Sequence, residues 1–187
     1  VGDDASAPGD DAAAVRARYG GRTGRAESTV SLVGPDWAVE SRLPLVGAHQ
    51  ARNAGVAAAL ARETGAALGR PVDETAVERG LRRAYWPGRC EVGDDEPLTI
   101  LDGAHNPAAC RATAACLAEF DHDELHVVFA AMHDKDHAGM AAALPAPATV
   151  RTCAPTLDRA ATPENLAAVW ADAATDATVR ADDAVAT

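Results

Sequence analysis

The sequence is poor in lysine, in aromatic residues and in long apolar runs, and each shortage narrows the possible functions. Aromatic residues make up 4% of its 187 residues, and Lys135 is the single lysine beside many arginines. Acidic residues outnumber basic ones by 28 to 17, which gives a formal net charge of −11. Because such a charge repels the phosphate backbone, the composition disfavours a nucleic-acid-binding protein. It is typical of proteins adapted to high salt.

Membrane and redox signals are also scarce. No run approaches the roughly 20 apolar residues that a spanning helix needs, and residues 1–4 lack the basic and apolar start of a secretory signal. We therefore expect a cytoplasmic protein without a membrane anchor. Cys90, Cys110, Cys116 and Cys153 form no C-x-x-C pair, so we expect them to be reduced and mostly buried.

The first half of the chain predicts a hairpin followed by two helices. Residues 1–25 have few large apolar side chains and are expected to form a loose, disordered lead-in. Residues 28–33 and 37–45 are β-prone runs joined by a Gly-Pro-Asp turn, which indicates two antiparallel strands. Helical patterns then cover residues 48–64, which end at a glycine, and residues 73–85.

The apolar spacing supports both helices. In the first helix Val56 and Leu60 are four residues apart, and in the second Val77, Leu81 and Tyr85 repeat the same spacing. Side chains four apart lie on one face of a helix.

The second half alternates strands with helices. An alternation of this kind predicts an α/β fold with a mostly parallel sheet covered by helices on both faces. No strand is evident in residues 179–187. Ligands of such sheets bind beyond the carboxyl ends of the strands. The expected strands are residues 98–101, 125–130 and 149–153, and the expected helices are residues 107–120, 136–144 and 162–172.

Two turns at strand ends carry the best candidates for chemistry. In the first, Asp102 can accept hydrogen bonds from hydroxyls, His105 offers an imidazole, and Asn106 and Pro107 start a helix whose N–H groups attract anions. The alternative is structural: Asp102 and Asn106 tie the turn together while His105 faces solvent.

The second turn holds Asp134, Lys135 and Asp136 at the end of the next strand. A compact ammonium is not equivalent to a guanidinium, so the single lysine in an arginine-rich chain favours a specific role. A solvated helix cap is the structural alternative. A metal site formed by Asp134, Asp136, His133 and His137 is a further hypothesis, because these residue types are metal ligands.

Two further motifs precede these turns. Arg89 follows a rigid Pro-Gly pair, which suits a guanidinium aimed at a phosphate, although a linker with a surface arginine is the simpler interpretation. His49, Gln50 and Asn53 open the first helix, where they are candidates for helix caps or for contacts to a polar ligand.

In this order the motifs resemble the amide-ligase family that includes the Mur ligases, and in particular its folate branch of dihydrofolate and folylpolyglutamate synthases. The resemblance covers residues 27–172. It implies the end of a Mur-type central domain in residues 1–86 and a Rossmann-like C-terminal domain in residues 87–187. The motifs that carry it are His49-Gln50-x-x-Asn53-Ala54, Trp86-Pro87-Gly88-Arg89-x-Glu91, Asp102-Gly103-Ala104-His105-Asn106-Pro107 and Met132-x-Asp134-Lys135-Asp136.

The resemblance also implies a reaction and residue roles. ATP would phosphorylate a folate or dihydropteroate carboxylate, and the amino group of L-glutamate would then displace the phosphate. The implied roles are Asn53 near the nucleotide base, Arg89 at the ATP phosphates, Asp102 at the ribose, His105 in catalysis and nucleotide contact, Lys135 in catalysis, and His49, Gln50, Asp134 and Asp136 along the cleft.

The chain departs from the family in its missing phosphate loop and in the final strand with a Gly-Ser turn, which is not evident in residues 179–187. Nothing in it matches the G-x-x-x-x-G-K-[ST] phosphate loop. The resemblance places that loop, together with the Mg²⁺ ligands, in an N-terminal half, which we expect to be required in cis or in trans. Another Mur-type amino-acid ligase and a non-catalytic fragment of the family remain as alternatives.

Overall fold

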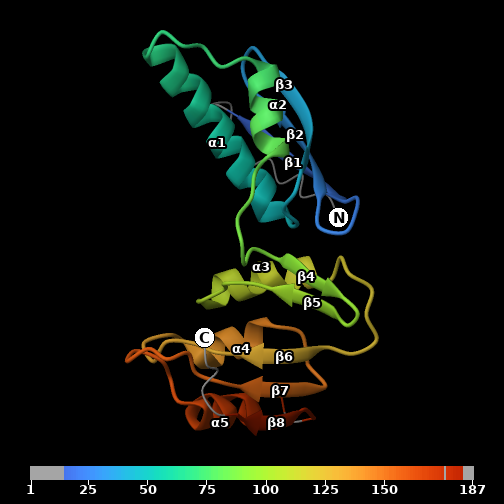
Figure 1. The fold of residues 1–187 in the computed structure, drawn as a ribbon, viewed down its shortest axis with the longest axis vertical. Helices are drawn as coiled ribbons and strands as arrows, with labels where there is room; N and C mark the ends of the chain where they lie inside the picture. Colours follow the sequence, from blue (N-terminus) through green and yellow to red (C-terminus); the bar gives the residue numbers. More distant parts are fainter. Residues whose placement is uncertain (1–14, 175, 183–187) are drawn as a thin grey trace, which may run out of the picture. The chain divides into compact units, whose positions relative to one another are not determined.

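The computed structural model describes residues 15–174 and 176–182. The chain divides into two compact units, Val1–Leu101 (unit 1) and Asp102–Thr187 (unit 2), which are shown in Figure 1. Within the described ranges, no helix combines the length and the apolar character needed to cross a membrane.

Unit 1 is built on a three-stranded antiparallel sheet. Its strands are β1 (Arg16–Arg22), β2 (Ser28–Val33) and β3 (Ala38–Leu43), in the order β1-β2-β3. The predicted pairing of β2 with β3 is confirmed. The lead-in prediction is wrong for β1, and its remaining residues 1–14 lie outside the described part of the chain.

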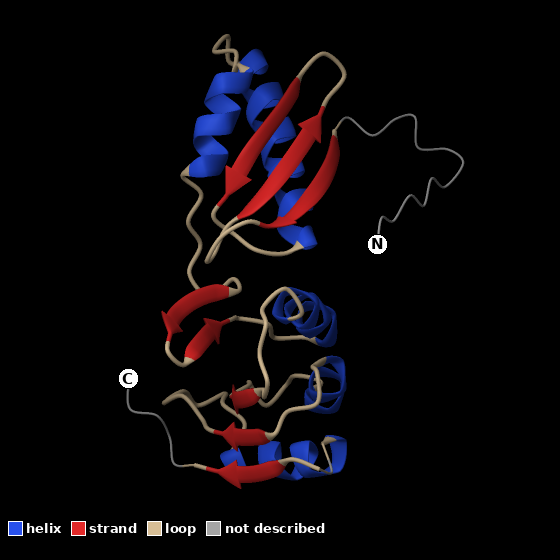
Figure 2. Ribbon diagram, turned by 90° about the vertical axis from the view of Figure 1, so that its right-hand side faces the viewer, coloured by secondary structure: helices blue, strands red, loops and turns tan. Residues whose placement is uncertain are grey.

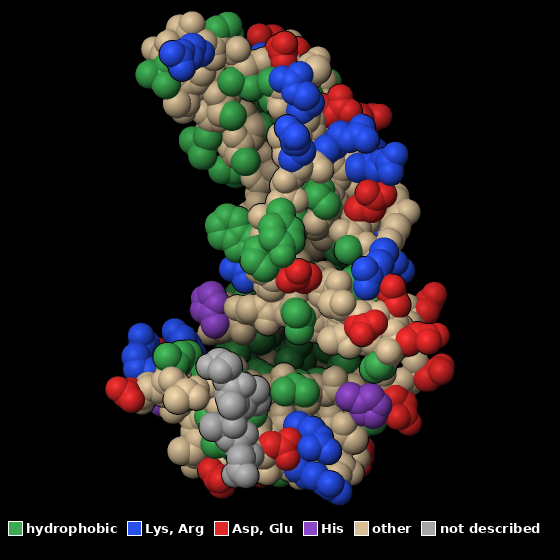
Figure 3. Space-filling view, in the orientation of Figure 1, with side chains coloured by type: hydrophobic (Ala, Val, Ile, Leu, Met, Phe, Trp, Pro, Cys, Tyr) green, Lys and Arg blue, Asp and Glu red, His purple; other side chains and the backbone are tan. Residues whose placement is uncertain are grey.

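Helix α1 (Ala48–Ala67) packs on this sheet through its smallest residues. A Cβ placed on Gly55 would lie 3.0 Å from the Cβ of Ala17, so the missing side chain sets how closely helix and sheet approach. Val56 and Leu60 are instead 61% and 63% exposed, and Figure 3 shows hydrophobic side chains on the surface over α1. These larger side chains would hold the helix away from the sheet if they faced it.

Helix α2 (Glu74–Arg82) completes the core of unit 1. The Asp73 carboxylate accepts a hydrogen bond from the Ala76 N–H at 2.7 Å and so caps the helix. Val77 and Leu81 are buried, whereas Tyr85, which the sequence pattern placed on the same face, is 75% exposed. The helix ends before Tyr85, so the helical spacing no longer applies there.

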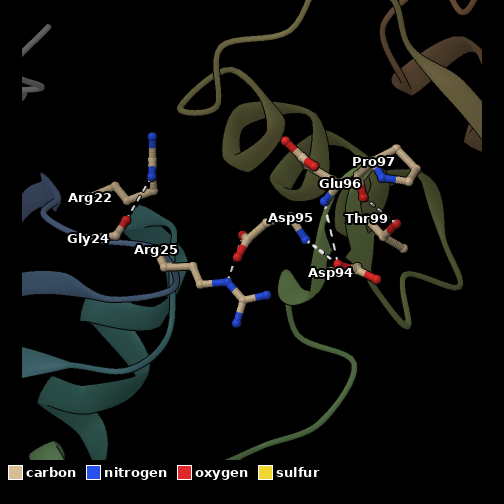
Figure 4. A network of polar contacts seen from close by, with 8 residues as sticks. All are labelled: Arg22, Gly24, Arg25, Asp94, Asp95, Glu96, Pro97 and Thr99. Atoms are coloured by element: carbon tan, nitrogen blue, oxygen red, sulfur yellow. Dashed lines mark hydrogen bonds and ion pairs between the residues drawn. The ribbon is translucent and has the colours of Figure 1, made fainter.

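A two-stranded antiparallel hairpin, β4 (Glu91–Asp95) and β5 (Leu98–Leu101), ends unit 1. The prediction that β5 belongs to the parallel sheet is therefore wrong. At the hairpin tip, Asp94 Oδ1 accepts a hydrogen bond from the Asp95 N–H at 2.7 Å, and Asp95 pairs with Arg25 at 2.7 Å (Figure 4). Residues 96 and 97 join β4 to β5, so β5 pairs with its neighbour in the sequence instead of a distant sheet.

Unit 2 is an α/β unit whose strands form a parallel sheet in the order β6-β7-β8. The predicted α/β class with a mostly parallel sheet is confirmed. The expectation that residues 179–187 contain no strand is wrong, because β8 begins at Thr178. The elements are α3 (Pro107–Leu117), β6 (His126–Phe129), α4 (His137–Ala143), β7 (Thr149–Thr152), α5 (Pro163–Ala173) and β8 (Thr178–Ala181).

The core of unit 2 lies between this sheet and its helices. Trp170 of α5 meets Phe129 of β6 edge to face, with ring centroids 5.4 Å apart, and Leu166 is fully buried beside them. Figure 2 shows α4 and α5 on the same side of the strands. Right-handed crossovers that advance in one direction require this arrangement. For the described residues, the prediction of helices on both faces is wrong, and Val128 on the other face is 72% exposed.

Two of the four cysteines are free and two are oxidised. Cys110 and Cys153 are free and buried, as predicted. Cys90 and Cys116 are disulfide-bonded, so the prediction of four reduced cysteines is wrong for these two. Sequence spacing could not indicate this, because a disulfide depends on distance in the fold.

Candidate functional site

The turn that follows β5 is held together by its own polar side chains. Asp102 Oδ1 accepts hydrogen bonds from the Ala104 N–H at 2.8 Å and from the Thr113 hydroxyl at 2.9 Å. Asn106 caps α3 by accepting from the Ala109 N–H at 2.8 Å. Asp102 and Asn106 therefore tie the turn together, as in the structural alternative. These hydrogen bonds fix the positions of both side chains at the start of α3.

His105 in the same turn is exposed, and its Nδ1 lies 3.1 Å from the carbonyl oxygen of Gly103. When this contact is a hydrogen bond, Nδ1 carries the proton and donates it. The other ring nitrogen of the neutral imidazole is then the acceptor, which suits contact with a donor group or a proton in a ligand.

The second turn, after β6, is clamped by a loop from further along the chain. Met132 forms an antiparallel bridge with Ala160, and the His133 N–H donates to the Arg159 carbonyl at 2.8 Å. Asp134 receives two cations, Lys135 at 3.4 Å and Arg159 at 3.3 Å. The turn is therefore fixed by both backbone and ionic contacts.

Charges around Asp134 control its ionisation. Desolvation acts to raise its pKa, but a backbone hydrogen bond and the positive charges of Lys135 and Arg159 outweigh it, and the pKa lies below its ordinary value. The carboxylate thus stays ionised and holds the Lys135 ammonium, whose side chain is 31% exposed.

The starts of α3 and α4 lie against each other. A Cβ placed on Gly139 would meet Asp136 Oδ2 and would lie 2.8 Å from Pro107 Cγ. Asp136 caps α4 by accepting from the Gly139 N–H at 2.9 Å. The structure therefore brings the turn of Asp102 and the turn of Lys135 to one end of unit 2.

The remaining predicted residues belong to unit 1. The N-cap of α1 is Gly47, and no side chain caps this helix, so the cap interpretation of His49, Gln50 and Asn53 is wrong. Gln50 is buried, and its Oε1 accepts a hydrogen bond from Asn53 Nδ2 at 3.1 Å. Gln50 therefore orients the exposed amide of Asn53.

Arg89 sits in a turn tied by an acidic residue. Gly88 has a φ of 66°, which favours glycine, and its N–H donates to Glu91 Oε2 at 2.7 Å. The half-buried Arg89 donates to the carbonyl of Gly88 at 3.2 Å. Glu91 thus fixes the turn that presents the guanidinium.

Sequence reasoning missed two residues that touch predicted site residues. Thr113 bonds Asp102 from α3, and Arg159 bonds Asp134 from the loop before α5. Their signals are weak, because a threonine in an alanine-rich helix and an arginine in an arginine-rich chain do not stand out.

A cavity of about 220 Å³ in unit 1 contains none of the predicted site residues. Arg62 on its wall lies 5.0 Å from the centre of the Trp37 ring and donates to the Val72 carbonyl at 2.7 Å. This arginine is thus engaged in packing contacts within unit 1.

The metal hypothesis for the second turn is wrong. Across residues 15–174 and 176–182, no three His, Cys, Asp or Glu side chains are grouped to hold a metal ion. His137 Nε2 instead lies 2.9 Å from the carbonyl oxygen of Met132, while Asp134 is engaged by cations and Asp136 caps α4.

Unit 2 has a parallel sheet, and the capped starts of α3 and α4 lie together with the turn of Lys135. In α/β domains, ligands bind at the edge formed by the carboxyl ends of the strands. The family model described as "Mur ligase, glutamate ligase domain" matches residues 88–187, more than half of the chain. The chain therefore belongs to the Mur ligase family.

Two relatives that cover most of the chain lie in the folate branch, which confirms the resemblance drawn from the motifs. A "probable bifunctional folylpolyglutamate synthase/dihydropteroate synthase" of Halobacterium salinarum is 57% identical over 159 residues, covering 85% of this chain and 19% of the relative. A protein of the same name from Haloferax volcanii is 49% identical over 171 residues, covering 91% and 20%. The chain spans about a fifth of these relatives.

A solved structure agrees with them. The folylpolyglutamate synthase of Mycobacterium tuberculosis, described as complexed with ADP, superposes with a TM-score of 0.79 and 33% identity. The match covers 89% of this chain and 37% of that one.

Proposed function

We propose that this chain is part of an ATP-dependent ligase that joins L-glutamate to the carboxylate of a folate or dihydropteroate. One observation carries the proposal: in a Mur-family chain, the turn of Asp102 and the turn of Lys135 meet where the starts of α3 and α4 touch. The similarity to a probable bifunctional folylpolyglutamate synthase and to a folylpolyglutamate synthase complexed with ADP supports it.

The reaction has two balanced steps. A substrate carboxylate oxygen attacks the γ-phosphorus of ATP, and ADP leaves as an acyl phosphate forms. The glutamate amine then attacks the acyl carbon, inorganic phosphate leaves with the C–O bond pair, and the nitrogen loses a proton. Both steps concentrate negative charge on oxygens, so positioning and fixed positive charge account for most of the catalysis.

Each site residue of unit 2 has a proposed role that suits its chemistry. In this proposal Asp102 accepts hydrogen bonds from the ribose, while His105 and Lys135 contact the nucleotide or the reacting phosphate. The ammonium of Lys135 suits charge neutralisation, since it is partly exposed and is held by Asp134. Asp134 and Asp136 shape this turn.

Unit 1 supplies the other contacts. Asn53 meets the base, Gln50 orients Asn53, His49 lies along the cleft, and Arg89 meets the ATP phosphates. Two observations support this assignment: the buried Gln50 holds the Asn53 amide, and the tied turn at Gly88 presents the Arg89 guanidinium.

The proposal includes parts outside this chain. Mg²⁺ and its ligands belong with the phosphate loop, in a separate half that works in cis or in trans. Residues 1–86 complete the central domain and residues 87–187 form the C-terminal one. A reaction that consumes ATP favours a cytoplasmic location.

A chimera tests the proposal. This chain replaces the matched segment of the Halobacterium salinarum relative, and ADP release is measured in molar potassium chloride with and without glutamate and folate acceptor. We expect release that needs both co-substrates and that falls at least tenfold in Lys135→Met and His105→Ala. No release from the chimera, when the parent relative is active in the same assay, contradicts the proposal.

The same assay separates the alternatives. Release with another amino acid or carboxylate acceptor, and none with glutamate and folate, would identify a different Mur-type ligase. A folded chimera that is inactive with every acceptor would support a non-catalytic chain.

A further inference from the structure

Thr113 stands on the face of α3 that lies against Asp102. Its Oγ1 is 2.9 Å from Asp102 Oδ1 and 3.1 Å from the carbonyl oxygen of Ala109. A hydroxyl has one proton to donate, and the carboxylate is both nearer and the stronger acceptor. The Thr113 hydroxyl therefore donates to Asp102.

Two donors from different elements thus meet one carboxylate oxygen. The Ala104 N–H approaches from the turn at 2.8 Å and the Thr113 hydroxyl from the helix. The terminal torsion of an aspartate is soft, so each donor on the carboxylate narrows the rotation of its plane. The Thr113 hydroxyl is one of the donors that narrow it.

The charge of Asp102 also acts on a neighbouring thiol of this helix. Cys110 is fully buried one turn before Thr113. Its pKa is raised, mainly by burial and in addition by the negative charge of Asp102. The carboxylate therefore lies close to the α3 surface that Thr113 shares.

We propose that Thr113 is a positioning residue that orients Asp102 for the ribose hydroxyls of the nucleotide. The inference rests on the proposed function, because that function assigns the ribose to Asp102. A hydrogen bond from a ribose hydroxyl needs an acceptor oxygen held in one direction, and binding is weakened when the acceptor must first be ordered.

The test compares isosteric variants in the chimeric ligase. Thr113→Val removes the hydroxyl at nearly constant shape, Thr113→Ser keeps it, and Thr64→Val at an exposed position of α1 is the matched control. We expect the KM for ATP to rise about 3- to 10-fold in Thr113→Val, as for one weakened hydrogen bond. The kcat and the KM for glutamate should stay within about twofold, and Thr113→Ser should restore the KM for ATP.

A nucleotide analogue separates positioning from a general structural effect. The KM for 2′,3′-dideoxy-ATP, which has no ribose hydroxyls, should be the same in wild type and Thr113→Val. An equal rise for both nucleotides, or an unchanged KM for ATP, overturns the inference.

A second measurement does not depend on turnover. The crystal structure of the Thr113→Val chain should show the Asp102 carboxylate rotated or in two conformers. A single conformer identical to wild type overturns the inference even in an inactive chimera. Absence of ADP release from the wild-type chimera contradicts only the proposed function, so the two failures are distinct.

Discussion

Replacing Trp170 with phenylalanine should leave the stability of unit 2 almost unchanged, although the side chain is 1% exposed. The smaller ring leaves a cavity of up to about 40 Å³, which costs about 1 kcal/mol at about 24 cal/mol per Å³. Lost apolar burial adds about 1 kcal/mol. In the described part of the chain, however, the buried indole N–H has no hydrogen-bond partner, and removing such a group returns about 1–3 kcal/mol. The cost of the cavity and of the lost burial is therefore nearly offset by the removal of the unsatisfied N–H.

The assay is native-state hydrogen exchange of the slowest amides in β7 and α5, which reports the unfolding free energy of unit 2 separately from unit 1. Leu166→Ala is the control: its fully buried side chain has no polar atom, and we expect a loss of about 2–5 kcal/mol. A loss above about 2 kcal/mol in Trp170→Phe would refute the reasoning and would mean that the indole N–H is satisfied in solution.

Three further outcomes test the geometry of unit 2. Asn106→Ala should cost about 1 kcal/mol because it removes the α3 cap, whereas Asn106→Asp should keep the cap; equal losses in urea unfolding would exclude a capping role. Gly139→Ala should destabilise unit 2 by about 1–3 kcal/mol since its methyl group meets the cap of α4 and the start of α3. The matched Gly80→Ala in α2, with open space around it, should stabilise unit 1 by about 0.4–1 kcal/mol. Arg159→Gln should raise the pKa of Asp134 toward its ordinary value, read by carboxyl NMR titration. Because the folded-state pKa is lowered, the stability that Asp134 contributes is present above the ordinary value and is lost as the pH falls through the folded-state pKa. A titration of Asp134 identical to wild type would exclude Arg159 as a cause.

Periodicity predicted the elements whose apolar residues dominate the pattern. Alternation in residues 28–33 gave a correct strand, and the capped, proline-led starts of α3 and α5 were visible as Asn106-Pro107 and Thr162-Pro163. Strand β1 was missed because Gly20 and Gly21 dilute an alternation in which Ala17 and Tyr19 are half-buried. A period-two count over that segment would have been the available signal.

Burial along α1 depends on tertiary packing. Val56 and Leu60 have the expected spacing, but α1 is placed by its glycine and alanine face, and no local pattern ranks small residues above large ones. In the candidate site, too, some residues were predictable from the sequence and others were not. Sequence placed Asp102 and Lys135 in strand-end turns, whereas their partners Thr113 and Arg159 are 11 and 25 residues from the carboxylates that they bind. Such contacts depend on the fold, so the spacing of residues in the sequence does not reveal them.

The scarcity of lysine gives the turn of Lys135 an unusual experimental advantage. The chain has one ε-amino group, and it sits beside Asp134 at 3.4 Å. Lysine-selective isotope labelling therefore yields a single side-chain resonance, with no mutagenesis and no assignment problem. The chain carries its own spectroscopic probe at the point where the two candidate turns meet.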